Sequence, residues 1–248
     1  METYQKIIDL HTELEKVDYE KIKNAKQLIA PETERDFKGK HPEIPLHHDH
    51  ADMGGRVLKE VLELRHSTRT YSGRKITVNE FGNILYYSDG IKSHRSNAYN
   101  KDKYPVLFSP SAGGLMPINI YVAISEMEDV DSGFYYYSPS REALVQLFKG
   151  RPELELSKIY VSGFPQFAPV NIIMTGDVRR FYWKYDNRGY RLLNVDCGIM
   201  AENMCLLAEE QRIGSCMIAA FDNTAVGKVL RLDSEELPLL CLSLGGEL

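Results

Sequence analysis

The hydrophobic positions of the chain fall into short apolar runs separated by longer amphipathic stretches. Three runs rich in β-branched and aromatic residues predict strands over residues 118–125, 133–138 and 170–176. A nearly continuous apolar run over 237–246 predicts a further strand, buried on both faces. Only a short acidic stretch separates the first two strands, so they could pair with each other through a turn.

Helical periodicity marks the stretches between these runs. Apolar side chains recur every three or four positions in four places, which predicts helices over 3–29, 57–64, 196–212 and 224–230. Strands and helices are mixed along the chain without a strict alternation. The predicted fold class is therefore α+β.

Capping signals indicate where individual helices begin and end. Thr77 and Glu80 have the spacing of a capping box and predict the start of a helix. Ser138 followed by proline has the residue types of a helix start, which predicts a helix through residues 139–147. Gly214 is expected to end the helix that precedes it.

The segment after the first predicted helix is polar. Residues 30–55 contain three prolines and a pair of adjacent glycines, a composition typical of a linker or an arm. We therefore divide the chain into an N-terminal helix with a polar arm, residues 1–55, and one domain, residues 56–248.

Three histidines, His47, His48 and His50, surround Asp49 in this arm. These residue types can bind a metal ion. Neighbouring side chains rarely converge on one ion, however, so an exposed polar loop is the preferred interpretation.

Composition and charge narrow the classes of protein. The chain has 248 residues, of which 43% are hydrophobic, enough for a core without a disulfide or a metal. The net charge of −5 argues against nucleic acid as the main partner. No stretch approaches the ~18 apolar residues of a membrane-spanning helix, and the first residues lack a signal-peptide pattern. The four cysteines, without CxxC spacing, are typical of reduced core thiols in a cytoplasmic protein.

Arg65 and Arg69 lie four positions apart, on one side of either a helix or a strand, with Ser67 between them. Two guanidinium groups and a hydroxyl are typical of a phosphate site. A solvated basic helix end is an equally good interpretation, because arginine also favours the C-terminal end of the helix dipole.

Two stretches of small residues raise a second question of chemistry. Residues 109–114, SPSAGG, and residues 214–220 offer backbone N–H groups with little side chain in the way. Such stretches indicate either close packing or a flat ligand that lies against the main chain.

Basic and aromatic side chains alternate over residues 179–191, which include the only tryptophan. Lys184 lies there among other cations, and a lysine so placed can lose its proton near neutral pH and act as a base. Tyr185 could donate or relay a proton. The alternatives are a small nucleic-acid patch and a surface segment held by Asp177 and Asp186.

In their order along the chain, these pieces resemble the FMN-dependent nitroreductase superfamily. Within it they resemble the SagB-type dehydrogenases, the thiazoline and oxazoline oxidases of peptide natural-product pathways. The resemblance runs from about Val57 to the end of the sequence, and ordinary nitroreductases lack the segment KY-x-x-RGYR. The motifs that carry it are LRHSTRTYSG, SPSAGGLMPINIYV, GFYYYSP, RFYWKYDNRGYRLLNVDCG and RIGSCMIAAFD.

The resemblance implies an α+β homodimer with a mixed or antiparallel sheet and with FMN at the subunit interface. It assigns the first motif to the FMN phosphate and ribityl chain, the small-residue loop to the flavin ring, usually of the second subunit, and a Lys-Tyr pair to azoline oxidation. It also assigns two alanines to the flavin N5 edge. The matching positions are Arg65, His66, Ser67 and Arg69; Ser109, Pro110, Ser111, Ala112 and Gly113; Ala219 and Ala220; and Lys184 with Tyr185.

The implied function is an FMN-dependent oxidoreductase that converts azoline rings of a modified peptide to azoles, with a cyclodehydratase complex as a candidate partner. Two alternatives stay open: an NAD(P)H-dependent reductase of nitro compounds or quinones, and a flavin-free scaffold in a peptide-modifying complex. The chain departs from the family where nitroreductases often place a basic residue on the phosphate, since it reads SLGGEL there. The N-terminal helix and the His-rich arm are unmatched.

Overall fold

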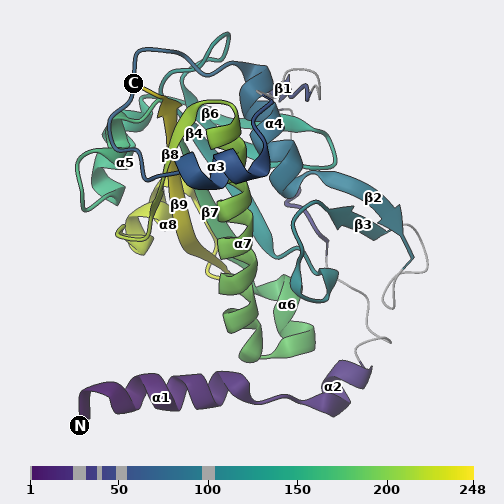
Figure 1. Cartoon of the computed structure of the whole chain (residues 1–248). Coiled ribbons are helices and arrows are strands. Elements are labelled where there is room, and N and C mark those ends of the chain that lie inside the picture. Colours follow the sequence, from purple (N-terminus) through teal and green to yellow (C-terminus); the bar gives the residue numbers. More distant parts are fainter. Residues whose placement is uncertain (1, 25–31, 38–40, 49–54, 97–103) are drawn as a thin grey trace.

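The computed structural model describes residues 2–24, 32–37, 41–48, 55–96 and 104–248. Its centre is a seven-stranded sheet in the order β1-β6-β5-β4-β7-β9-β8, with every neighbouring pair antiparallel (Figure 1). The strands are β1 (Glu43–Pro45), β4 (Ile118–Ile124), β5 (Gly133–Ser138), β6 (Ala143–Lys149), β7 (Val170–Asp177), β8 (Ile213–Ile218) and β9 (Glu236–Gly246).

Helices cover both faces of this sheet. One face packs on α4 (Val78–Asp89) and the long α7 (Arg188–Glu210), and the other packs on α5 (Pro152–Ile159) and α8 (Asn223–Leu230). A short helix, α3 (Leu58–Leu64), lies on α7. The remaining elements are the hairpin of β2 (Ile91–Arg95) and β3 (Tyr104–Leu107), the helix α6 (Val178–Tyr185), and the short 3-10 helices Ala112–Gly114 and Pro165–Phe167.

Alternation along β4 explains the two cores. Ile118, Ile120 and Val122 belong to the core under α4 and α7, whereas Tyr121 and Ala123 belong to the core under α5 and α8. Both sets are buried, so β4 is apolar on both faces apart from the buried Asn119. The predicted α+β class and the strands predicted at 118–125, 133–138, 170–176 and 237–246 are confirmed.

Local capping chemistry also holds for α4. Thr77 Oγ1 accepts a hydrogen bond from the Glu80 amide (3.1 Å), and the Glu80 carboxylate accepts one from the Thr77 amide (2.9 Å). These two reciprocal bonds form the predicted capping box.

The predicted helix over 139–147 is wrong, because β6 occupies this stretch. Pairing with β5 on one side and β1 on the other satisfies its backbone groups and outweighs the local helix signal. Ser138 Oγ donates to Glu34 instead of capping a helix. Gly214 does not end α7 either, since it lies inside β8, where a Cβ would meet Thr68.

Two helix boundaries also differ from prediction. The helix predicted over 196–212 begins earlier, at Arg188, within the basic and aromatic segment. The helix predicted over 3–29 is interrupted: α1 (Glu2–Glu15) and α2 (Tyr19–Asn24) are separate, and Asp18 accepts a hydrogen bond from the Lys21 amide (2.8 Å) where α2 begins. The end of this prediction, from residue 25, lies outside the described residues.

The polar arm contributes to the sheet rather than only linking to it. Its β1 is the edge strand beside β6, and Leu46 next to it is buried in the core. Earlier in the arm, Arg35 contacts the face of the sheet that packs on α5 and α8. It forms a hydrogen bond with Tyr121 and an ion pair with the buried Glu236 (2.9 Å). Among the arm's histidines, the His48 ring stacks on Tyr86, with ring centroids 3.5 Å apart.

Candidate functional site

The small-residue loop at 109–113 is fixed to α7 by side-chain hydrogen bonds. Asn203 Nδ2 donates to Ser109 Oγ (2.8 Å). Asp196 accepts a bond from Ser111 Oγ (2.9 Å) and another from the Ala112 amide (2.9 Å). Asn203 and Asp196 are about two helical turns apart, so one side of α7 holds the whole loop.

Asp196 is a buried carboxyl group on the apolar side of α7. Burial raises its pKa above the ordinary value, while the hydrogen bonds from Ala112 and Ser111 act in the opposite direction by stabilising the ionised form. Ser111 Oγ also accepts a bond from the Met116 amide (2.9 Å). The loop is therefore tied down before and after its glycines.

Lys184 and Tyr185 lie directly behind Gly113. A Cβ atom built on Gly113 would lie 2.5 Å from Lys184 Nζ and 2.5 Å from Tyr185 Oη. The same glycine has φ +63°, in the left-handed region, and is exposed on its other side. The loop is thus small for two reasons: its backbone turns, and two side chains meet its inner surface.

Lys184 and Tyr185 also contact each other. Lys184 Nζ lies 4.6 Å from the centre of the Tyr185 ring. The lysine is only 6% exposed, although it carries a charged group on a flexible stem. The structure therefore brings the predicted catalytic pair together with the predicted flavin loop in one chain.

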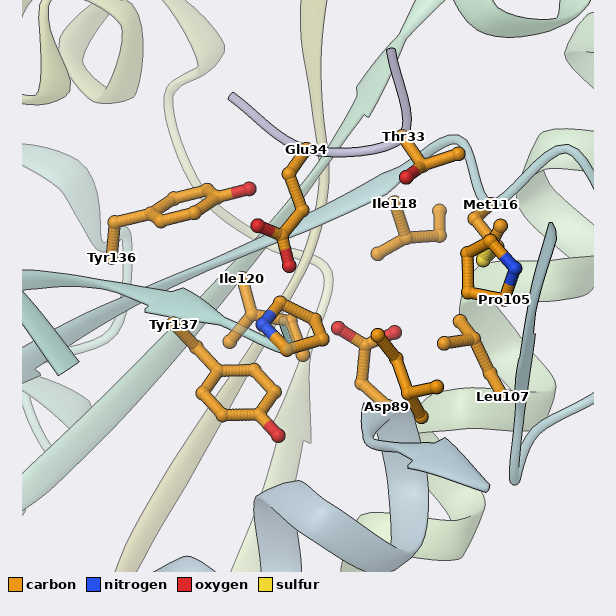
Figure 2. Close-up of a pocket in the computed structure, with 12 residues that line it drawn as sticks. Thr33, Glu34, Asp89, Pro105, Leu107, Met116, Ile118, Ile120, Tyr136 and Tyr137 are labelled. Carbon is orange, nitrogen blue, oxygen red and sulfur yellow. The ribbon is translucent and has the colours of Figure 1, made fainter. Parts of the chain in front are cut away.

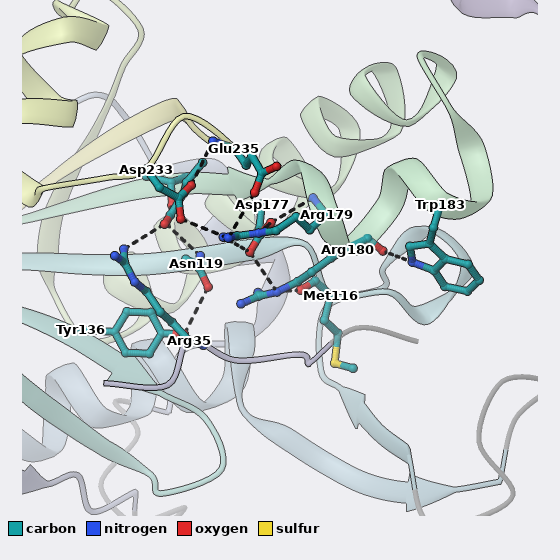
Figure 3. A network of polar contacts seen from close by, with 12 residues as sticks. Arg35, Met116, Asn119, Tyr136, Asp177, Arg179, Arg180, Trp183, Asp233 and Glu235 are labelled. Carbon is teal, nitrogen blue, oxygen red and sulfur yellow. Dashed lines mark hydrogen bonds and ion pairs between the residues drawn. The ribbon is translucent and has the colours of Figure 1, made fainter. Parts of the chain in front are cut away.

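The helix that carries this pair, α6, is anchored by the polar network of Figure 3. Asp177 caps the helix by accepting from the Arg179 amide (3.0 Å), and its carboxylate also binds the Arg179 side chain (2.8 and 2.9 Å). Arg180 donates to the carbonyl of Met116 (3.1 Å), and Trp183 Nε1 donates to the carbonyl of Arg180 (2.8 Å). Because Met116 follows the small-residue loop, α6 and the loop are joined at a second point.

The first motif follows α3 and runs beside β8. The Thr68 amide donates to the carbonyl of Ser215 (2.8 Å), which fixes the motif on the sheet. Arg65 and Arg69 diverge from this point. Arg65 Nε faces Glu202 on α7 at 3.7 Å, whereas the Arg69 guanidinium lies 6.0 Å from the centre of the Phe164 ring.

A cavity of about 430 Å³ opens beside the first motif. Its volume is in the range typical of small-molecule sites. The carboxylates of Glu209 and Glu247 line this cavity together with basic and hydroxyl side chains. Burial, and then the negative charge of Glu247, raise the pKa of Glu209. The lining residues are Arg56, Leu64, His66, Ser67, Thr68, Arg69, Thr70, Glu209, Glu247 and Leu248.

Ala219 and Ala220 are exposed at the end of β8, on the same side as the first motif. The Val161 amide donates to the carbonyl of Ala220 (3.4 Å), which joins these alanines to the segment that contains Phe164. Phe164 in turn meets Arg69. Arg69, which is predicted to bind the phosphate, and the two alanines predicted at the N5 edge therefore lie in the same region of the surface.

The predicted site residues fall into two groups, which reach α7 at adjacent residues: Arg65 faces Glu202, and Ser109 accepts a hydrogen bond from Asn203. Among the described residues, no direct hydrogen bond, ion pair or ring contact joins residues 65–69 to residues 109–113. The 430 Å³ cavity contains no residue of the small-residue loop. We call residues 109–113 with Lys184 and Tyr185 the inner half-site, and residues 65–69 with Ala219 and Ala220 the outer half-site.

Several residues of these half-sites are not among the residues predicted from the sequence. Asp196 and Asn203 hold the loop, and Arg56, Thr70 and Glu247 line the cavity. A signal existed for Asp196 alone, because an acidic residue on the apolar stripe of a helix needs a partner. The others are recruited by contacts between distant segments.

The described residues hold no group of three or more His, Cys, Asp or Glu side chains placed to bind a metal ion. Of the predicted HHDH cluster, His47 and His48 are described, while Asp49 and His50 lie outside the described residues. All four cysteines are buried and free of disulfides, as predicted. In the part of the chain that the structure covers, none of the helices has the length and apolarity needed to cross a membrane.

Two curated proteins match the sequence over a large part of the chain. A nitroreductase-type protein of Methanocaldococcus jannaschii, MJ1384, is 28% identical over 76% of this chain and 90% of its own length. The microcin B17-processing protein McbC of Escherichia coli is 25% identical over 56% of this chain. That match takes in 53% of McbC, about half of its length.

Solved structures share the fold. A nitroreductase from Anabaena variabilis superimposes with a TM-score of 0.68 at 23% identity, covering 84% of this chain and 42% of that larger chain. A chain of the Escherichia coli microcin synthetase McbBCD complex with truncated pro-MccB17 bound superimposes with a TM-score of 0.60 at 19% identity, covering 74% and 71%. At these identities the likeness concerns the fold alone.

The family model for nitroreductases matches residues 62–246, which is well over half of the chain. This range includes the first motif, the small-residue loop, the Lys-Tyr pair and the alanines after β8. The order and packing of the elements agree with the solved nitroreductase structures. The chain therefore belongs to the nitroreductase family and is an oxidoreductase of that fold.

Proposed function

We propose that this protein is an FMN-dependent dehydrogenase that oxidises thiazoline or oxazoline rings of a modified peptide to azoles. The observation that carries the proposal is the position of Lys184 Nζ and Tyr185 Oη, both against Gly113 of the small-residue loop. The SagB-type resemblance of the KY-x-x-RGYR segment supports it. So does the sequence match to McbC, a protein named for processing microcin B17.

The outer half-site has donors that fit a flavin phosphate. Arg69 is exposed, and its guanidinium donates only a long hydrogen bond to the carbonyl of Ser67 (3.3 Å) within the described residues. The hydroxyls of Ser67 and Thr70 line the same cavity. The exposed main chain at Ala219 and Ala220 leaves room for a ring edge. When bound, FMN supplies the two-electron acceptor for the hydride that the azoline ring loses.

Lys184 is the proposed base for the ring proton. Its amine is mostly shielded from water, beside Gly113 of the loop, which is the kind of position in which lysine bases occur. Tyr185 Oη meets the loop at the same point and would orient the amine or pass the proton on. The anchoring of α6 and of the loop fixes both groups before a substrate arrives, and positioned groups react faster than mobile ones.

A second copy of the chain would complete the site, because among the described residues no direct hydrogen bond, ion pair or ring contact joins residues 65–69 to residues 109–113. The small-residue loop of one subunit would then face the first motif of the other. Apolar side chains exposed around α3 and α7 support such a homodimer, since this face lies beside the loop. These side chains are Leu58, Leu62, Val195 and Ile199.

Mass spectrometry of an azoline-containing peptide tests the proposal directly. The FMN-loaded protein should remove two hydrogens from each ring. Lys184→Ala should lower this rate by about 100-fold or more, the contribution of a positioned base, while the flavin absorbance is retained. Lys228→Ala, at an exposed lysine on α8, is the matched control and should leave the rate unchanged. Full activity of flavin-bound Lys184→Ala would contradict the role of Lys184.

NAD(P)H-dependent reduction of nitro compounds or quinones is the second candidate function. The match to MJ1384 over 90% of that protein favours it. This function needs the outer half-site and does not need Lys184. Anaerobic addition of NADPH separates the two candidates, because rapid bleaching of the flavin bands supports the reductase and unbleached bands support the azoline dehydrogenase.

A partner complex accompanies the main proposal. The McbBCD structure contains a chain of this fold together with other proteins and a truncated pro-peptide. We propose that this chain likewise works beside a cyclodehydratase in the cytoplasm, where its buried thiols would stay reduced. A protein that binds such a partner but purifies without flavin would instead support the scaffold alternative.

A further inference from the structure

The two N-terminal helices lie across the junction of α6 and α7, next to the Lys-Tyr pair. In Figure 1, α1 runs apart from the sheet and meets the body only near the start of α7. The contacts that hold them are polar: Asn187 Nδ2 to Glu13 Oε1 (2.8 Å), Arg188 Nη1 to the carbonyl of Glu15 (2.8 Å), and an ion pair between Lys21 and Asp186.

A cavity of about 220 Å³ separates these helices from the catalytic pair. Lys184 and Tyr185 line its inner wall. Val17 and Ile22 belong to its outer wall, which the N-terminal segment supplies. The Lys-Tyr pair therefore lies between Gly113 and a hollow whose far wall is supplied by the N-terminal segment.

The helices α1 and α2 contact the rest of the domain mainly through polar groups, and the apolar side chains of α1 are not packed in a core. Tyr4, Ile7, Ile8 and Leu10 of α1 are all more than half exposed. On α2, Lys21 Nζ adds a contact with the face of the Tyr182 ring, at 5.0 Å from its centre. A segment held by a few exposed polar contacts opens at low free energy compared with a packed core.

The backbone is unusual at Asp186, the residue that forms the ion pair with Lys21. Asp186 ends α6 with φ +48° and ψ −143°, a conformation that residues with a side chain rarely adopt. In this conformation its carboxylate reaches Lys21. Such outliers persist where the surroundings hold them, and they cluster at ligand clamps and switches.

We propose that α1 and α2 form a movable wall over the Lys184–Tyr185 pair, latched by Lys21–Asp186 and Glu13–Asn187, which opens to admit a peptide that carries the ring. This inference rests on the proposed azoline oxidation for its substrate class. A free five-membered ring with small substituents fits the 220 Å³ cavity with the wall in place. A ring within a peptide carries main chain on both sides, and opening of the wall would widen the hollow for that chain.

Chemical labelling of Lys184 tests the wall without any catalytic turnover. In the full-length protein, Lys21→Ala or Glu13→Ala removes one latch contact, and each should speed labelling of Lys184 by an amine-reactive acetylating reagent by about two- to tenfold, the factor expected from one polar contact. Mass spectrometry of the digested protein gives the rate at this single lysine. Hydrogen exchange of residues 182–188 should rise in the same variants.

Lys23→Ala is the matched control, because Lys23 is an exposed lysine on α2 outside the latch contacts. It should leave the labelling of Lys184 at the wild-type rate. Unchanged labelling and exchange in both latch variants would overturn the wall. Equal acceleration by Lys23→Ala would do so as well, because the effect would then follow the charge of α2 and not the latch.

Kinetics with two substrates extends the test. Lys21→Ala should raise kcat/KM for an azoline within a peptide by about two- to tenfold and leave kcat/KM for a small free azoline unchanged. An equal change for both substrates would overturn the selective role of the wall. Failure of the wild-type protein to oxidise either substrate would refute the proposed function instead, and Lys184 labelling would still decide whether the wall opens.

Discussion

The inner and outer half-sites are built in opposite ways. In the inner half-site Ser109, Lys184 and the supporting Asp196 are 3%, 6% and 5% exposed, and hydrogen bonds fix the loop at several points. In the outer half-site the side chains of Arg69 and His66 are exposed and border an open cavity. The chain therefore fixes the proposed proton-transfer groups in advance and leaves the proposed anion-binding groups open.

This difference indicates where each kind of change should act. A small steric change in the inner half-site has no room to relax, because the interior is close-packed. Removal of a charge in the outer half-site leaves the fold intact and alters affinity. Four substitutions, taken from the largest expected effect to the smallest, would break or sharpen this contrast.

Gly113→Ala should have the largest effect. The new methyl group would lie 2.5 Å from Lys184 Nζ and from Tyr185 Oη, so the pair must move. A misplacement of about 1 Å in a catalytic group can lower the rate by about 100-fold. We expect a loss of that order in azole formation, measured with flavin bound.

Gly114→Ala is the matched control for this substitution. Gly114 also has a positive φ, +68°, but a Cβ there meets nothing within 4 Å. Both variants should lose about 1–2 kcal/mol of stability from the left-handed backbone. Only Gly113→Ala should lose activity beyond that. Equal activity of the two variants would show that the Lys-Tyr pair does not depend on the small loop.

Arg69→Ala tests the outer half-site, and its effect should appear in affinity alone. Loss of one charged hydrogen-bonding group costs about 1.5–3 kcal/mol, so FMN binding should weaken by about 10- to 100-fold. Flavin fluorescence titration measures the change, and the melting temperature without flavin should stay at the wild-type value. Arg65→Ala is the comparison. Because Arg65 faces Glu202, its loss should weaken binding less.

Much of the inner half-site follows from local sequence, but its assembly does not. The small residues of SPSAGG and the left-handed turn at Gly113 are properties of the segment itself, so the prediction of a loop without bulky side chains could be made from it. The contact of Gly113 with Lys184 joins segments about seventy residues apart, and only the fold sets it. Asp196, an acidic residue on the apolar stripe of α7, signals a need for a partner, but the sequence does not say that the partner is this loop.

The errors in secondary structure have a similar origin. The capping box at Thr77 was predictable because both partners lie within one turn. Ser138 carries an equally good local signal, but β6 pairs with β1 and β5, and long-range pairing outweighs local propensity. The start of α7 at Arg188 lies in a polar aromatic segment without clear periodicity, so the sequence placed it too late.

The stability of the folded protein should also depend on pH, through Asp89 at the end of α4, close to where the small-residue loop begins. Figure 2 shows its carboxyl group facing that of Glu34 across a small cavity. Burial, and then the negative charge of Glu34, raise the pKa of Asp89 well above its ordinary value, while Arg180 opposes this. The neighbouring Ser88 accepts a backbone hydrogen bond from Ser109, where the small loop begins (3.2 Å).

The sign of the effect follows from the raised pKa. Between the ordinary and the raised value the folded protein binds more protons than the unfolded chain, so stability falls as pH rises through this window. An asparagine at this position cannot ionise, so the free energy of unfolding of Asp89→Asn should not decrease across this pH window. In the wild-type protein the decrease should be about 1.4 kcal/mol for each tenfold difference in proton affinity between the folded and unfolded states. Urea unfolding at several pH values measures it. Asp129→Asn, at an exposed carboxylate, should keep the wild-type slope.

Glu247→Gln should give the smallest effect and the sharpest information on the open cavity. Glu247 lines the cavity beside Arg69, where many nitroreductases would present a basic group according to the family resemblance. Its negative charge should repel a bound phosphate, and because the site is open to water the repulsion is screened to about 1 kcal/mol or less. FMN should therefore bind about two- to fivefold more tightly to the variant, most clearly at low salt.

Glu128→Gln, an exposed residue away from this cavity, should leave the affinity unchanged. Weaker binding by Glu247→Gln would mean that this carboxylate contributes a hydrogen bond to the ligand, and the phosphate would then have to be placed away from it, nearer to Arg65.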